Sequence, residues 1–215
     1  MSDKPSRLYQ FRVFIRGISP AIWRRILLYE NHTLADLHHT LQIAFDWSDE
    51  FMHQFLIRGR SYSIWHTLGT NTDKEASEVS LSSLCLHKHE RFLYEYNFFV
   101  WWQVEIRLEA QLPFNNRHSY PYCQGGKRAG PPENCGGPRE YIHLRDDVYH
   151  PVFVFDRVRE LLEDTDDDET LHDRIHNEFP DLWYWANAPQ FDCKACNMRL
   201  KQYTDGDDSW RGLMI

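Results

Sequence analysis

Hydrophobic and polar residues alternate along the first part of the chain, which is typical of half-buried β-strands. Residues 8–16 place apolar side chains on one face and polar side chains, two of them arginines, on the other. Residues 17–20, which include a glycine and a proline, interrupt this strand, and residues 22–29 continue as a second one. The pattern therefore predicts two consecutive strands at the start of the fold.

A helical pattern follows these strands. Its apolar positions are spaced by three or four residues and so share one face: Leu34, Leu37, Leu41 and Phe45. Thr33 precedes this run and Asp36 stands three residues later, which is the spacing of a capping box. We expect the helix to end near Trp47, with a strand over residues 51–58 and a hairpin-like turn at Gly59 after it.

The longest alternation covers residues 92–108, where every second position is apolar. It predicts β-structure, either one long bent strand or two strands with a bulge, because no glycine marks a turn. Residues 69–78 are polar and predict a loop, and residues 81–86 predict a short helix or turn.

Residues 113–139 are rich in proline and glycine and poor in aliphatic residues, so we expect an irregular loop. Loops of this length often serve a function or need an internal staple. The rest of the chain predicts helices, with an acidic run at 163–169 between the second and the third: 139–148, 152–163, 170–178 and 191–202.

These elements predict an α+β protein with a mainly antiparallel twisted sheet packed with helices and an acidic helical C-terminal part. A chain of 215 residues can bury a sizeable core. We expect residues 1–150 to form the α+β core and residues 151–203 an acidic helical extension packed on it. Residues 204–215 are expected to be a polar tail.

The net charge is −8, which argues against a protein that coats nucleic acid without sequence preference. The charge is uneven, because residues 1–28 carry +5 and residues 150–192 carry −9. The two ends could attract each other or engage different partners. Ordinary solvated faces are the simpler interpretation.

The sequence predicts a cytoplasmic protein with no membrane partner. No apolar run approaches the roughly 20 residues that cross a bilayer. The N-terminal residues lack the hydrophobic segment of a secretory signal. The five cysteines are an odd number, unlike a small disulfide-bonded secreted scaffold. The pattern makes no prediction of the oligomeric state.

Four cysteines suggest a structural zinc site. Cys193 and Cys196 are two residues apart, and Cys123 and Cys135 flank part of the proline- and glycine-rich stretch. Four thiolates form the ligand set of a closed zinc site, and such a site contributes about 10–16 kcal/mol of apparent binding energy. The alternative is that no cofactor is bound, with Cys123 and Cys135 as free thiols or paired with His118.

Histidines offer a second candidate. His38 lies on the expected helix beside its apolar face, and His53 lies on the following strand. The pair could be catalytic or bind a metal, although histidines in such positions are more often held by hydrogen bonds in the core. His172 and His176 share a helix face but lack the acid of a zinc-protease motif. We therefore nominate no catalytic residue.

A basic surface is the third candidate. Arg24 and Arg25 follow Trp23 on the second strand, and Arg12 and Arg16 lie on the neighbouring strand. Such a patch could contact phosphates or an acidic protein surface, although ordinary solvated strand faces would also fit. With these four arginines, we take two further residues as candidate binding residues: His53 and Trp102.

Four sequence blocks occur in order along the chain: Ile18–Arg25, Thr33–Phe55, Tyr94–Trp102 and Cys123–Gly137. The last contains Pro-Pro-Glu-Asn-Cys-Gly-Gly and is the most specific. Together they resemble the plasmid pRiA4b ORF-3-like family, whose members occur on plasmids and transposable elements and are often labelled TnpR-like. The resemblance implies an α+β domain in a mobile-element setting and no settled activity. The chain has no recombinase-like serine context, so we do not adopt a resolvase function.

The chain departs from the family pattern in the third block. The family reads approximately Tyr-Asp-Phe-Gly-Asp-x-Trp-x-His, and the positions that differ here are Asn97, Phe99, Val100 and Val104, with Phe51 where a histidine is common. If the family's acids and histidine form a polar site, this chain has lost much of it and the region becomes plain β-surface. The cysteines at 193 and 196 also fall outside the pattern, so a four-cysteine site would be peculiar to this chain.

We expect a non-enzymatic accessory or interaction protein of a plasmid or transposable element, which binds a protein or DNA partner through its aromatic and basic surface. One alternative is a metal-dependent nucleic-acid-processing enzyme, with the metal held by His53, His38 and carboxylates. Another is an acidic decoy that inhibits or regulates a host system.

Overall fold

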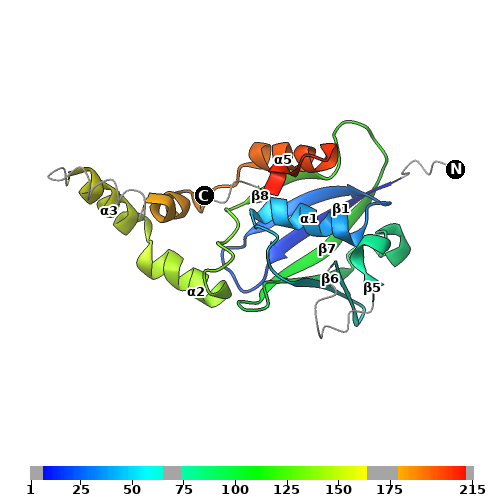
Figure 1. Ribbon diagram of the computed structural model, residues 1–215, viewed down its shortest axis with the longest axis horizontal. Coiled ribbons are helices and arrows are strands. Elements are labelled where there is room, and N and C mark those ends of the chain that lie inside the picture. Colours follow the sequence, from blue (N-terminus) through cyan, green and yellow to red (C-terminus); the bar gives the residue numbers. More distant parts are fainter. Residues whose placement is uncertain (1–6, 65–73, 164–178, 212–215) are drawn as a thin grey trace.

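The computed structural model describes residues 7–64, 74–163 and 179–211 (Figure 1). It contains an eight-stranded sheet with the order β5-β4-β3-β6-β7-β1-β2-β8. The β4–β5 pair is parallel, and the other neighbouring pairs are antiparallel. The strands are β1 (Arg7–Ile15), β2 (Trp23–Tyr29), β3 (His53–Ile57), β4 (Arg60–Ser63), β5 (Lys74–Glu75), β6 (Arg91–Tyr96), β7 (Trp102–Pro113) and β8 (Tyr122–Lys127).

Helices cover and extend this sheet. The longer ones are α1 (Leu34–Phe45), α2 (Gly137–His143), α3 (Pro151–Glu163), residues 179–187 and α5 (Cys193–Asp205). The short ones are η1 (Ala76–Glu78), η2 (Ser82–Leu84), the π-helical η3 (Leu144–Val148) and η4 (Asp208–Arg211). The predicted α+β class, with a mainly antiparallel sheet packed with helices, is confirmed. Within the described residues, every helix is too short or too polar to span a lipid bilayer.

The capping box predicts the start of α1 correctly. The backbone N–H of Asp36 donates to Thr33 Oγ1 (3.1 Å), and the Thr33 N–H donates to Asp36 Oδ2 (2.7 Å). The leucines of the apolar stripe and Phe45 are buried in the main core. Asp46 ends the helix in the left-handed conformation, with φ 60°. Helix α1 therefore lies across the sheet with a fixed rotation about its own axis (Figure 1).

The long alternation at 92–108 contains a turn, so the prediction of one bent strand or two strands with a bulge is wrong. Strands β6 and β7 form a hairpin in which Tyr96 is opposite Trp102. Asn97 and Trp101 adopt left-handed backbone with φ 51° and 58°, a conformation usually supplied by glycine. Asparagine tolerates this region better than most residues. The divergent positions 97–100 therefore form a turn rather than plain β-surface.

The stretch 113–139 is not irregular throughout. Strand β8 lies inside it and pairs with β2, with Cys123 opposite Ile26. A Cβ on Gly126 would lie 2.6 Å from Trp23 O and 2.7 Å from Arg24 Cδ, so only glycine fits there. The two glycines of β8 hide the strand from sequence patterns. The expected loop at 69–78 is also too simple, because its described part forms β5 and η1.

Two buried tryptophans, one after α1 and one at the start of β7, hold the Pro-Pro-Glu-Asn segment in place through hydrogen bonds. Trp47 Nε1 donates to Pro131 O (3.0 Å), and Trp102 Nε1 donates to Glu133 O (2.9 Å). Buried indole N–H groups need such acceptors. We expected Trp102 to be a binding residue. It is fully buried, so it supports the fold and offers no binding surface.

The predicted C-terminal helices 139–148, 152–163 and 191–202 correspond to α2 with η3, to α3 and to α5. The helix predicted at 170–178 lies outside the described residues. Within the segment that we expected to be a polar tail, residues 208–211 form η4 and bury Trp210 to 3% exposure against Tyr203. The division of the chain at residue 150 stays a prediction.

Helices α2, η3, α3 and 179–187 form an arm that extends from the sheet (Figure 1). Trp185 lies against the rings of Tyr141 and Tyr149, with centroid distances of 5.2 and 5.3 Å. Tyr184 Oη donates to Gly130 O (2.9 Å), which ties the arm to the segment after β8. The arm thus has its own small core and a fixed attachment.

The Glu133 carboxylate holds two elements together, and we predict that its removal destabilises the fold. It accepts a hydrogen bond from Ser48 N (2.8 Å) and from Tyr96 Oη (2.6 Å). Replacing Glu133 with alanine should lower the free energy of unfolding by about 1–3 kcal/mol, because both donors lose their acceptor. Urea unfolding measures this change. Glu140→Ala, at an exposed acid of α2, is the control and should change stability by less than about 0.5 kcal/mol. Equal effects would contradict the prediction.

Candidate functional site

Two histidines that the sequence singled out meet inside the fold. His38 comes from α1 and His53 from β3, and their rings stack with centroids 3.7 Å apart and an interplanar angle of 18°. Both are buried. The capping box sets the rotation of α1, and the alternation of β3 points His53 to the same side of the sheet as Phe55. Two local patterns thus converge on one position.

Both ring nitrogens of His38 have partners. Nδ1 lies 2.8 Å from Tyr94 Oη, and Nε2 lies 2.5 Å from Asp49 Oδ1. Gln42 connects the two partners: its Nε2 donates to Tyr94 Oη (2.8 Å), and its Oε1 accepts from Asp49 N (3.1 Å). Asp49 takes left-handed backbone with φ 65°, which turns the chain back toward α1. The imidazole of His38 is therefore fixed in orientation.

A third histidine borders this network. His39 Nε2 lies 3.6 Å from Asp49 Oδ2, and His39 Nδ1 lies 3.3 Å from Tyr203 Oη. Tyr203 in turn donates to Asp36 Oδ1 (2.7 Å), so α5 helps to position this side chain. We call His38, His39, His53 and Asp49 the histidine cluster.

Burial governs the charge of the cluster. It lowers the pKa of His38 and His53 well below the ordinary 6.5, and the neighbouring histidines add to this effect. Burial also raises the pKa of Asp49, against the opposing influence of His39. His53 Nδ1 is buried and makes no hydrogen bond within the described residues, while its Nε2 accepts from Ile64 N (3.4 Å). The imidazoles are therefore neutral at neutral pH, the form that binds metals.

The cluster has the composition of a metal site. One ring nitrogen each of His38 and His39 and a carboxylate oxygen of Asp49 lie within 4.8 Å of one another. In the part of the chain that the structure describes, this is the one group of three histidine, cysteine or acidic side chains that converges in this way. Imidazole nitrogen and carboxylate oxygen together suit Zn²⁺ and similar ions.

The structure does not bring the four cysteines of the expected zinc site together, and that site stays a prediction. All five cysteines of the chain lie in described segments, and none belongs to a converging ligand group. Cys193 Sγ donates to Cys123 O (3.2 Å), which brings β8 and α5 together. Cys135 lies apart, in the loop before α2, and its N–H donates to Pro132 O (3.2 Å).

The cysteines are free thiols. No disulfide joins them, and burial raises the pKa of Cys135 and of Cys193 to about 11. His118, the alternative partner, stacks on Tyr122 at 3.9 Å. These cysteines therefore pack as small side chains in the arrangement that the structure shows.

The basic surface is smaller than the sequence suggests. Arg24 is 1% exposed and donates to three backbone carbonyls, so it is not a surface residue. Arg25 pairs with Glu109 through two hydrogen bonds of 2.6 and 3.1 Å. Arg12 lies over the Trp23 ring at 4.4 Å, and Arg16 is exposed. Two of the four arginines are thus committed to contacts within the fold.

Sequence reasoning missed several members of the network: His39, Gln42, Asp49 and Tyr94. The signal was partly present, because Gln42 is four residues after His38 and so lies on the same helix face. Nothing local indicates that Tyr94 faces His38, because that contact depends on how α1 crosses the sheet. Val104, where the resembled family has a histidine, is buried opposite Tyr94.

The fold and cluster define an α+β protein with a buried, neutral group of histidines beside a carboxylate. The family model described as plasmid pRiA4b ORF-3-like protein matches residues 7–200, and the chain belongs to this family. The uncharacterised protein y4hQ of Sinorhizobium fredii is 22% identical over 189 residues, covering 87% of this chain and 85% of that protein. A crystal structure of the protein of unknown function MM3350 from Methanosarcina mazei Go1 matches with a TM-score of 0.61 and 28% identity, covering 89% and 98% of the two chains. None of these descriptions states an activity.

We predict that acid destabilises the metal-free protein through His38 and His53. Their folded-state pKa values lie below the ordinary 6.5, so the unfolded chain binds more protons as pH falls through this value. Their contribution is complete above the ordinary pKa of 6.5 and is lost progressively as pH falls below it. Each extra proton costs about 1.4 kcal/mol per pH unit. Urea unfolding in a chelator should show this slope. His53→Gln should flatten it, and an unchanged slope would contradict the assignment.

Proposed function

We propose that this protein binds a divalent transition-metal ion, with His38, His39 and Asp49 as ligands. The observation that carries the proposal is the convergence of two imidazole nitrogens and a carboxylate oxygen within 4.8 Å. A half-buried carboxylate beside neutral imidazoles gains most from a cation that supplies the missing positive charge. The proposal develops the metal-dependent alternative, and it moves the metal from the cysteines to the histidine cluster.

The surroundings of His38 support metal binding. A metal-ligating histidine usually uses its second ring nitrogen in a hydrogen bond that fixes the ring. His38 has this arrangement, because Nδ1 faces Tyr94 Oη at 2.8 Å while Nε2 points to Asp49. Binding would exchange the 2.5 Å contact between Nε2 and the carboxylate for two bonds to the ion.

The exposed side of the cluster provides an entry path. The side chains of His39 and Asp49 are 19% and 11% exposed, whereas that of His38 is fully buried. Three protein ligands leave a coordination position for water, which is the arrangement of catalytic rather than structural zinc. Because Nε2 of His53 accepts from Ile64 N, the neutral ring carries its proton on Nδ1, which is available as a hydrogen-bond donor beside the site.

Metal content tests the proposal. Protein expressed without a histidine tag should bind about one Zn²⁺ or Co²⁺ per chain, measured by calorimetry and by elemental analysis after dialysis. His39→Gln and Asp49→Asn should each abolish stoichiometric binding. Tyr94→Phe should retain the stoichiometry and weaken affinity by about 10–100-fold, because it removes the partner that orients His38.

The matched control is His87→Gln, which removes an exposed histidine that lies outside the cluster. It should bind the ion like the unaltered protein. Binding that survives His39→Gln and Asp49→Asn together, or no stoichiometric binding by the unaltered protein, would refute the proposal. Circular dichroism confirms that each variant is folded.

A second candidate function is the expected accessory role, in which the arm binds a protein partner. Large apolar side chains of the arm are exposed to solvent: Val152, Phe153, Phe155, Phe179 and Trp183. Exposed apolar groups of this size, when they gather on one element, are typical of interaction surfaces. The acids among them, Asp156 and Glu160, pair with Arg159 and Arg157 of the same helix, so a partner with an apolar surface fits best. DNA fits less well, because Arg24 is buried and Arg25 is paired.

Substitution of the exposed phenylalanines tests this role. Phe153 and Phe155 are 56% and 74% exposed, so serine at both positions should leave the fold intact. Affinity for a partner identified by cross-linking in the native host should fall by about tenfold or more, measured with the purified proteins. Phe99→Ser, at an 87% exposed position on the β6–β7 turn, is the control and should retain binding. Unchanged affinity of the double variant would refute the role of the arm.

A further inference from the structure

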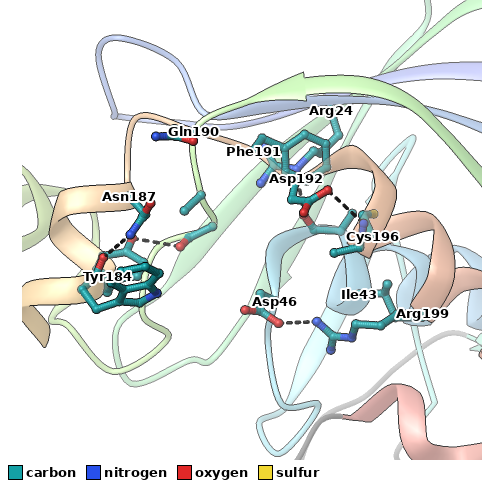
Figure 2. Close-up of a pocket in the computed structure, with 15 residues that line it drawn as sticks. Arg24, Ile43, Asp46, Tyr184, Asn187, Gln190, Phe191, Asp192, Cys196 and Arg199 are labelled. Carbon is teal, nitrogen blue, oxygen red and sulfur yellow. Dashed lines mark hydrogen bonds and ion pairs between the residues drawn. The ribbon is translucent and has the colours of Figure 1, made fainter. Parts of the chain in front are cut away.

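A cleft with a volume of about 670 Å³ lies between the C-terminal end of α1, the segment after β8, residues 183–192 and the first turn of α5. Figure 2 shows Arg24 and Phe191 together on one side, with Tyr184 and Asn187 across from them. The volume falls within the range of small-molecule sites. None of the histidine-cluster side chains lines this cleft, so it is a separate site.

Arg24 is a buried cation in the wall of the cleft. Its Nε donates to Ala44 O (2.7 Å), and its Nη1 donates to Trp23 O (2.9 Å) and Lys127 O (3.0 Å). Within the described residues, Nη2 donates no hydrogen bond and the guanidinium forms no ion pair. Carbonyl oxygens therefore satisfy two nitrogens, while the positive charge has no counter-charge.

Aromatic rings fix the plane of this guanidinium. Its Cζ lies 3.7 Å from the centroid of Phe191 and 5.1 Å from that of Phe45. A Cβ on Gly126 would approach Arg24 Cδ at 2.7 Å and Phe191 Cδ1 at 2.8 Å, so the strand packs closely against this stack. Nη2 is therefore the nitrogen that remains for a ligand.

The two acids at the cleft already have partners. Asp46 forms an ion pair with Arg199 (Figure 2). Asp192 Oδ1 caps α5 by accepting from Lys194 N (2.8 Å) and Ala195 N (3.0 Å). Burial lowers the pKa of Arg24 to about 10, so the group stays charged at neutral pH. Buried charges in proteins are normally paired, because an unpaired one is costly.

We propose that this cleft binds a small molecule whose oxyanion group, a carboxylate or a phosphate, pairs with Nη2 of Arg24. The rings of Trp183 and Tyr184 line the same cleft and provide contact for an aromatic or apolar body. The side chains of Asn187 and Gln190 add hydrogen-bonding groups at its edge. A fixed, desolvated guanidinium recognises an oxyanion more strongly than an exposed one does.

NMR titration of the ¹⁵N-labelled full chain tests the proposal with three probes of similar shape. Benzoate carries a carboxylate, phenyl phosphate carries a phosphate, and benzamide is uncharged. At least one anion should produce saturable shifts of the backbone amides of Ala129, Gly130 and Ala195, which line the cleft. Benzamide should bind about tenfold more weakly or not at all. The stronger of the two anions shows which oxyanion the cleft prefers.

Two variants of α5 keep the test independent of folding. Ala195 is exposed and lines the cleft, and glutamate there should reduce anion affinity by about tenfold or more, because its carboxylate competes for Arg24. Met198→Glu places the same charge on an exposed position of the same helix that does not line the cleft. It should bind anions like the unaltered protein. Arg24→Gln should abolish binding where circular dichroism shows that it folds.

Three results would each overturn the proposal. The first is the absence of saturable shifts at the cleft with either anion. The second is equal affinity for benzamide and benzoate, which would show that the charge is not recognised. The third is equal anion affinity of Ala195→Glu and Met198→Glu, which would place binding elsewhere on the protein.

Discussion

The site depends on the two hydrogen bonds that the Glu133 carboxylate accepts. This carboxylate holds Ser48, in the turn after α1, and Tyr96, at the end of β6, through hydrogen bonds of 2.8 and 2.6 Å. The residue after Ser48 is Asp49, whose left-handed backbone directs its carboxylate to His38. The Pro-Pro-Glu-Asn segment, the most specific part of the family pattern, thus acts as a brace that sets the position of one proposed ligand relative to the helix that carries the others.

The buried polar groups of this fold are neutral at one site and charged at the other. In the histidine cluster the imidazoles are neutral, because desolvation lowers their pKa, and a metal ion would bring positive charge to the carboxylate. At the cleft Arg24 cannot lose its charge at neutral pH, so carbonyl oxygens and aromatic rings surround it and an anion is the missing partner. The two sites therefore favour ligands of opposite charge, although both involve α1 and its C-terminal end.

The β6–β7 hairpin explains how the chain can depart from the family pattern in this region and keep its fold. Asn97 keeps the turn without the family's acids, because it adopts left-handed backbone and its side chain donates to Glu133 O (3.1 Å). Val104 fills a buried position opposite Tyr94, where an imidazole would have faced the core. Loss of the acids and the histidine did not empty this region of polar groups, since His38 lies on the facing helix and bonds to Tyr94, which is opposite Val104.

The sequence by itself determined the elements whose signals are local: the capping box of α1, the alternation of β1 and β2, and the α+β class. Tertiary structure decided the turn at residues 97–101 and strand β8, because neither has a local signature: the turn lacks glycine, and β8 contains two. It also decided that Arg24 is buried while Arg25 is half-buried and paired with Glu109, which depends on the loop carrying Phe191 covering one side of β2. The contact between His38 and Tyr94 spans 56 residues. Spacing along the chain shows which face a residue occupies, and only packing shows what lies opposite that face.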